Sequence, residues 1–182
     1  MVLDAIRSEI EPHIRSIRDF PKKGINFRDI MPLFAQPKLV GELCETIASY
    51  AKTIEGGIDG VAGLEARGFL FGPQVAMHLN VPFLPIRKMG KLPGECVSAS
   101  YIKEYGVDIV EVQKDAVRPG QRFLIVDDLL ATGGTMRAAT DVIKKAGGVP
   151  VEAFLLIELA ELKGRAKLTD IKITSLLNYE TE

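Results

Sequence analysis

Two adjacent acidic residues, Asp127 and Asp128, follow a short run of apolar residues and precede a loop of small residues. The apolar run 123–126 is typical of a strand buried on both faces, so we expect both carboxylates at its carboxyl end. In the loop, small residues let backbone N–H groups turn inward, and the following helix N-terminus adds unpaired donors and a positive dipole. The segment therefore predicts a phosphate-binding loop, made of Ala131, Thr132, Gly133, Gly134 and Thr135.

This loop differs from two common phosphate-binding motifs. It lacks Gly-Lys-Ser/Thr after its glycines, and G-x-G-x-x-G does not occur in the chain. Two acids would repel a lone phosphate, but they suit the vicinal hydroxyls of a ribose or the water around a magnesium ion. A structural strand–turn–helix with a glycine-rich start explains each feature separately, but explains the whole string 123–135 much less well. We therefore expect a sugar phosphate whose 5′-phosphate lies in the loop.

Patterns of apolar residues predict the elements that position this segment. Spacings of three and four residues predict helices at 3–17, 37–54, 69–79 and 135–146. Alternating or continuous apolar runs predict strands at 58–63, 81–87, 107–113, 122–126, 151–157 and 171–177. The stretch 88–98 is polar and has no predicted element.

Short buried strands that alternate with helices are typical of an α/β fold with a central, mainly parallel sheet flanked by helices. The chain has 182 residues and no evident linker or repeat, so we expect a single domain over 1–182. In such sheets ligands bind beyond the carboxyl ends of the strands. The two acids and the loop stand at such an end.

Composition limits the possible partners. The net charge is -1, from 23 basic and 24 acidic residues, which argues against nucleic acid or a membrane surface as partner. The two cysteines, Cys44 and Cys96, form no CxxC pair, and the two histidines have no zinc-ligand spacing. No signal-peptide pattern or run of about 18 apolar residues is present, so we expect a cytoplasmic protein.

The string 123–135 resembles the signature of the type I phosphoribosyltransferases, which is four apolar residues, two acids, a short spacer and Ala-Thr-Gly-Gly-Thr. Other segments resemble the members of that family that act on adenine. They are Phe20-Pro21 with 24–30 for the base, 63–72 for pyrophosphate, and 87–94 with 101–106 for a mobile loop. The resemblance therefore extends over nearly the whole chain.

The resemblance implies a reaction and an organisation. Ribose 5-phosphate would pass from phosphoribosyl pyrophosphate (PRPP) to N9 of adenine, giving AMP and pyrophosphate in purine salvage. It implies a base-binding hood over 1–36, a core over 37–182 and a mobile catalytic loop over about 90–110. It also implies a homodimer and Mg²⁺ held through substrate oxygens and water, with no direct protein cage.

Roles of the cationic region follow from the same resemblance. Asp127 and Asp128 would lie at the ribose hydroxyls and favour a cationic sugar. Arg67 would be the arginine of the pyrophosphate loop, preceded by a strained peptide at Glu65-Ala66 that turns N–H groups toward an anion. The further pyrophosphate ligands would be Arg87, which acts across the dimer in some members, Lys88 and Lys91.

The base and the departing proton also have candidate residues by resemblance. Phe27 would stack on adenine, while the backbone at Asn26 and Arg28 would read its Watson–Crick edge, with Leu159 nearby. Asn26 replaces an expected aliphatic residue, and contact of its side chain with the ring would broaden base preference. Glu104 would manage the proton on the purine, and Tyr105 would cover the site.

Two other functions compete with this one. A phosphoribosyltransferase for guanine, hypoxanthine or xanthine would be expected to carry a Lys or Asp that reads the 6-oxo group, and 155–163 shows no such motif. A PRPP-sensing regulator on the same fold would carry an added DNA-binding domain or lose its loop residues. Retention of Glu104 and Lys91 in a near-neutral chain favours the enzyme.

Overall fold

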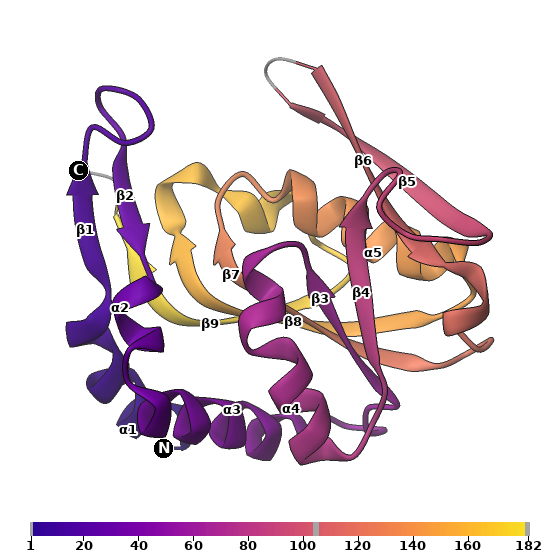
Figure 1. Ribbon diagram of the computed structural model, residues 1–182, viewed down its shortest axis with the longest axis horizontal. Coiled ribbons are helices and arrows are strands. Elements are labelled where there is room, and N and C mark those ends of the chain that lie inside the picture. Colours follow the sequence, from indigo (N-terminus) through magenta and orange to yellow (C-terminus); the bar gives the residue numbers. More distant parts are fainter. Residues whose placement is uncertain (1, 104–105, 181–182) are drawn as a thin grey trace.

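The computed structural model describes residues 2–103 and 106–180. Its centre is a seven-stranded sheet in the order β5-β6-β4-β3-β7-β8-β9 (Figure 1). The pairs β4-β3, β3-β7, β7-β8 and β8-β9 are parallel, and β5 and β6 extend the sheet antiparallel. The strands are β3 (Gly60–Leu64), β4 (Phe83–Lys88), β5 (Cys96–Lys103), β6 (Gly106–Gln113), β7 (Arg122–Leu130), β8 (Val149–Leu159) and β9 (Lys172–Tyr179). The expected α/β fold with a mainly parallel sheet is confirmed.

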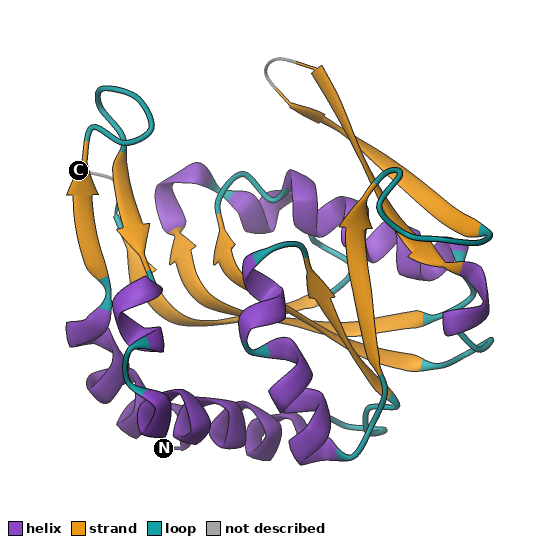
Figure 2. Cartoon of the chain, viewed as in Figure 1, coloured by secondary structure: helices purple, strands orange, loops and turns teal. Residues whose placement is uncertain are grey.

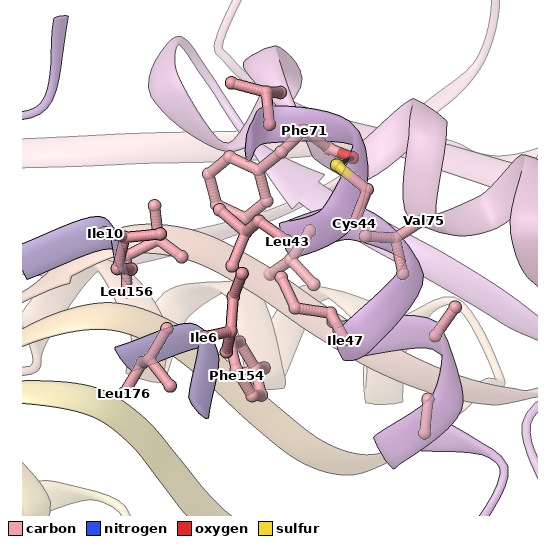
Figure 3. Close-up of a cluster of buried hydrophobic side chains, with 14 of the residues drawn as sticks. Ile6, Ile10, Leu43, Cys44, Ile47, Phe71, Val75, Phe154, Leu156 and Leu176 are labelled. Carbon is pink, nitrogen blue, oxygen red and sulfur yellow. Dashed lines mark hydrogen bonds between the residues drawn. The ribbon is translucent and has the colours of Figure 1, made fainter. Parts of the chain in front are cut away.

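Helices cover both faces of this sheet (Figure 2). One face carries α1 (Val2–Ile10), α3 (Pro37–Ala51) and α4 (Gly72–Leu79), and the other carries α5 (Gly134–Lys145). Figure 3 shows part of the first layer, where side chains from the three helices pack on Phe154 and Leu156 of β8 and Leu176 of β9. Strands buried on both faces explain why 123–126 is continuously apolar. Among the described residues, no helix is both long and apolar enough to cross a membrane.

The N-terminal part departs from the predicted helix 3–17. The α-helix ends at Ile10, a 3₁₀ turn covers Glu11–His13, and β1 (Arg15–Arg18) pairs antiparallel with β2 (Asn26–Asp29). Pro12 cannot donate the backbone hydrogen bond that a continuing helix needs, and β2 offers residues 15–18 a strand partner instead. This two-stranded hairpin stands at the edge of the molecule beside β9 (Figure 1), and the short α2 (Met31–Phe34) connects it to α3.

Three other elements differ from the prediction. Strand β5 was not predicted, and it lies within the segment expected to be a mobile loop, over about 90–110. It forms a hairpin with β6, which matches the predicted strand 107–113, and the two are paired from Cys96↔Gln113 to Lys103↔Gly106. The predicted helix 69–79 is divided at Phe71 into a 3₁₀ turn, η2 (Arg67–Leu70), and α4. Strand β7 runs on to Leu130, so the two acids lie within the strand rather than at its carboxyl end.

Candidate active site

The main candidate site is a cavity of about 420 Å³ at the carboxyl ends of β3 and β7. These strands are parallel and in register, Gly63 opposite Val126, so the residues that follow both strands reach the same edge of the sheet. The cavity brings together most of the predicted PRPP-binding residues. They are Glu65, Ala66, Arg67, Lys88, Asp127, Asp128 and the whole loop 131–135.

The loop 131–135 has the backbone geometry of an anion cradle. Gly133 stands at the N-cap of α5 with φ 77°, a conformation that glycine adopts without strain, and its carbonyl accepts the Arg137 N–H at 2.9 Å. The first N–H groups of α5 have no partner within the helix, and the first three residues of that helix, Gly134, Thr135 and Met136, line the cavity. Together with the hydroxyl of Thr132, and with that of Thr135 once it turns from Tyr101, these donors can hold a phosphate without any formal charge.

Asp128 and Arg67 form an ion pair in the cavity wall, with Nε 2.6 Å from Oδ2. Asp128 is 4% exposed. Burial raises its pKa, and the charge of Arg67 opposes that rise without cancelling it. Asp127 accepts the N–H of Asp128 at 2.9 Å. Burial, and then the negative charge of Asp128, raise the pKa of Asp127 well above its usual range. The ionised forms of the two carboxylates, Asp127 and Asp128, are therefore disfavoured, and positive charge placed against them would stabilise these forms.

Glu65 organises the predicted pyrophosphate cations. Its carboxylate accepts hydrogen bonds from the Lys91 ammonium at 2.6 Å, from Nε and Nη2 of Arg87 at 3.2 Å each, and from the Lys88 backbone N–H at 3.2 Å. The hydrogen bond from Lys91 is the main reason that the pKa of Glu65 falls to about 2, against the opposing effect of burial. The Glu65–Ala66 peptide bond is cis. Arg87 and Lys91 do not line the described cavity, although Lys88 does.

The predicted base-binding residues lie on β2 and β8, outside the cavity lining. Phe27 is the one that touches the rest of the site, since the Arg67 guanidinium lies 5.6 Å from its ring centroid. The side chain of Asn26 accepts a hydrogen bond from Ser16 across the hairpin, and so is directed along the hairpin. The Arg28 guanidinium lies over the Tyr179 ring at 4.2 Å. Leu159 ends β8 opposite Tyr179.

Two predicted residues, Glu104 and Tyr105, lie outside the described residues. Sequence reasoning missed Tyr101, which lines the cavity. Its hydroxyl accepts a hydrogen bond from Thr135 at 3.1 Å and donates one to Asp108 at 3.0 Å. The only sequence signal for it was its place in the segment 101–106, because its contact with α5 joins residues far apart in the chain. The cavity lining also includes Leu129, Leu130 and Met136.

Comparison with known proteins agrees with this geometry. A family model described as a phosphoribosyl transferase domain matches residues 32–179. The adenine phosphoribosyltransferase of Caenorhabditis elegans is 62% identical over 178 residues, which are 98% of this chain and 96% of that protein. Two solved adenine phosphoribosyltransferases superpose closely. The Saccharomyces cerevisiae enzyme has a TM-score of 0.92 at 41% identity, covering 96% of this chain and 99% of its own. The Thermoanaerobacter pseudethanolicus enzyme has a TM-score of 0.88 at 46% identity, covering 95% and 99%.

The mainly parallel sheet carries paired acids in β7, an anion-binding loop before α5, and cations after β3 and at the end of β4. This combination defines a phosphoribosyltransferase site. The chain belongs to the phosphoribosyltransferase family and, within it, to the adenine phosphoribosyltransferases. The resemblance noted in its sequence is thus confirmed.

Proposed function

We propose that the chain transfers ribose 5-phosphate from PRPP to N9 of adenine, releasing AMP and pyrophosphate in purine salvage. One observation carries the proposal: the Arg67–Asp128 ion pair lies in the same cavity as the loop 131–135. The same cavity is lined by Lys88 and by Glu65, whose carboxylate holds Arg87 and Lys91. An anion cradle, two acids and several cations in one region would suit a substrate with phosphate groups at both ends of a ribose. The yeast relative was solved with adenine and an imino-altritol bisphosphate.

The proposed mechanism is positioning and electrostatic stabilisation. The loop 131–135 would hold the 5′-phosphate through backbone N–H groups and hydroxyls. Asp127 and Asp128 would accept hydrogen bonds from the ribose hydroxyls and stabilise positive charge on the sugar as the bond to pyrophosphate breaks. Arg67 and Lys88 would stabilise the charge that develops on the departing pyrophosphate, with Arg87 and Lys91 behind them.

Adenine would stack on Phe27, whose ring is braced edge-on by Phe20 at a centroid distance of 5.2 Å. The Asn26 side chain accepts a hydrogen bond from Ser16. We therefore propose that only the backbone of Asn26 contacts the base and that the preference for adenine is retained. The proton that leaves N9 would pass to Glu104 as the glycosidic bond forms, so the bond to carbon replaces the N–H bond. Tyr105 would cover the closed site.

The donor set around Asp127 and Asp128 fits a magnesium ion. Both groups offer hard carboxylate oxygens. Burial raises the pKa of both, and the charge of Asp128 raises that of Asp127 further, so a cation bound against them would stabilise the ionised pair. We propose, as the resemblance implies, that most of the ligands of the ion would be substrate oxygens and water rather than a protein cage. Magnesium, when bound, would neutralise part of the pyrophosphate charge.

We also propose a homodimer that acts in the cytoplasm. Leu70, Met77 and Met89, on and around η2, α4 and β4, are exposed by 38, 78 and 60%, and offer apolar area for a subunit contact. Both cysteines are free thiols, with Cys44 buried, which suits a reducing compartment. Sedimentation at micromolar concentration would test the dimer, and a purely monomeric boundary would contradict it.

The test is incubation with PRPP, magnesium and, in parallel, adenine, guanine, hypoxanthine or orotate, with nucleotide products separated by chromatography. AMP from adenine alone is the expected result. Turnover of another base with no AMP from adenine would refute the proposal and favour the 6-oxopurine alternative. PRPP binding with no product from any base would favour a PRPP sensor.

A further inference from the structure

The segment 160–168, which follows β8, lies directly against the loop that follows β7 (Figure 1). Gly164 is buried at this contact. A Cβ on Gly164 would lie 3.0 Å from the Leu130 side chain and 3.1 Å from the Gly133 nitrogen, and would collide with the carbonyl oxygen of Ala131. In the opposite direction, a Cβ on Gly133 would collide with the carbonyl of Gly164. The two backbones therefore touch with no side chain between them.

Arg165, the next residue, fixes this segment to the sheet. Its guanidinium forms a fork on the carboxylate of Glu158 in β8, with Nε at 2.7 Å from one oxygen and Nη2 at 2.6 Å from the other. Its Nη1 donates to the backbone carbonyl of Ile173 in β9 at 2.8 Å. Ser175 donates to the same carboxylate at 2.7 Å. The Glu158 side chain is 8% exposed and the Arg165 side chain 48%, so this is a bidentate ion pair whose carboxylate is nearly buried, and its fork geometry holds the segment in one orientation.

We propose that Gly164 and Arg165 are positioning residues for the loop 131–135: Arg165 anchors the segment to β8 and β9, and Gly164 supports the loop by backbone contact. The inference rests on the proposed function, because the loop is taken to hold the 5′-phosphate of PRPP. The support matters since N–H donors must stay within a fraction of an ångström of the phosphate oxygens, and a misplacement of about 1 Å costs on the order of 100-fold in rate.

Gly133 explains why an external support is needed. The residue has positive φ and stands between β7 and α5, and as a glycine its backbone can adopt many other conformations. No hydrogen bond joins residues 131–133 to 164 among those described, so close packing alone sets the separation of the two backbones. Adding one methyl group at residue 164 would therefore displace the loop from its present position.

The test compares Gly164→Ala, Arg165→Gln and Arg165→Lys with two matched controls. Gly41→Ala adds a methyl in α3, where a Cβ meets nothing within 4 Å. Arg7→Gln removes an arginine whose Nε likewise donates to a β9 carbonyl, that of Leu176, at 2.6 Å. The readouts are Kd for PRPP with magnesium by calorimetry, KM for adenine at saturating PRPP, and Tm.

We expect Gly164→Ala to raise Kd for PRPP at least 10-fold, about 1.4 kcal/mol of binding free energy. Arg165→Gln should raise it about 5-fold and Arg165→Lys by less, because lysine keeps the charge but loses the fork. In these variants KM for adenine should stay within 2-fold of the parent value. In both control variants Kd for PRPP should stay within 2-fold of the parent value. If Gly164→Ala does not fold, the PRPP affinities of Arg165→Gln and Arg165→Lys test the inference.

A purely structural role predicts something else. PRPP binding within 2-fold of the parent enzyme in the folded variants, even with a lowered Tm, would overturn the inference. Parallel losses for PRPP and adenine, or an equal loss in Arg7→Gln, would also overturn it. Absence of PRPP binding in the unsubstituted chain would overturn the proposed function and the inference with it. If the parent binds PRPP and the variants bind it equally well, only the inference fails.

Discussion

Replacing Glu65 by glutamine should destabilise the protein near neutral pH by about 1–2 kcal/mol. The Glu65 carboxylate is 14% exposed and accepts from Arg87 and Lys91, and its pKa falls from 4.5 to about 2. At about 1.36 kcal/mol per pKa unit, the full shift corresponds to roughly 3.4 kcal/mol. Solvent screening reduces this figure, since the Arg87 and Lys91 side chains are 33 and 49% exposed.

The pH dependence has a definite sign. The folded-state pKa lies below the unfolded value, so the unfolded chain binds more protons between them. Stability from Glu65 is therefore fully present above about pH 5.5 and declines as the pH falls through 4.5 toward 2. The difference between the parent and Glu65→Gln should be largest at neutral pH and shrink at acid pH.

Urea unfolding at pH 7, 5.5, 4.5 and 3.5 measures this difference directly, from the midpoint and slope of each curve. Glu55→Gln is the control, because Glu55 is an exposed acid in the connection between α3 and β3. Equal stability of parent and Glu65→Gln at pH 7, or a difference that does not change with pH, would refute the assigned role of the carboxylate.

Three further substitutions test other parts of the site. Asp127→Asn should lower turnover more than 10-fold without lowering Tm at pH 7, since burial raises this carboxyl's pKa and its charge costs stability as the pH rises; a large fall in Tm would make it structural. Tyr101→Phe removes the link between Thr135 and Asp108 and should raise KM for PRPP about 3- to 10-fold in steady-state kinetics; an unchanged KM would contradict this. Phe27→Leu should raise KM for adenine about 10-fold with little change for PRPP, and the reverse pattern would remove Phe27 from the base site.

Local patterns were sufficient where one segment carries both the structure and the chemistry. The string 123–135 contains a buried strand, two acids and a helix start in succession, and the structure keeps them together in one cavity. The helix predicted at 3–17 failed because Ile14 and Ile17 continue a helical spacing that a strand partner overrides. Strand β5 was missed because its inward residues, Val97, Ala99 and Tyr101, alternate with serines but are too small or too weakly apolar to make a strong pattern.

Contacts between distant segments could not be predicted. The role of Glu65 depends on β3 and β4 being paired in register, with Leu64 opposite Ile86, so that Arg87 follows beside it. Contact between Gly164 and the loop 131–135 depends on the course of the chain after β8. The division into a hood over 1–36 and a core over 37–182 stays a prediction, as do the roles of Glu104 and Tyr105.

A crystal structure of the chain with AMP would test the central claim most directly. The proposed function predicts that the 5′-phosphate lies within hydrogen-bond distance of the N–H groups of 131–135, the ribose hydroxyls at Asp127 and Asp128, and adenine against Phe27. AMP bound with its phosphate at Arg87 and Lys91, or outside the cavity between β3 and β7, would contradict the account.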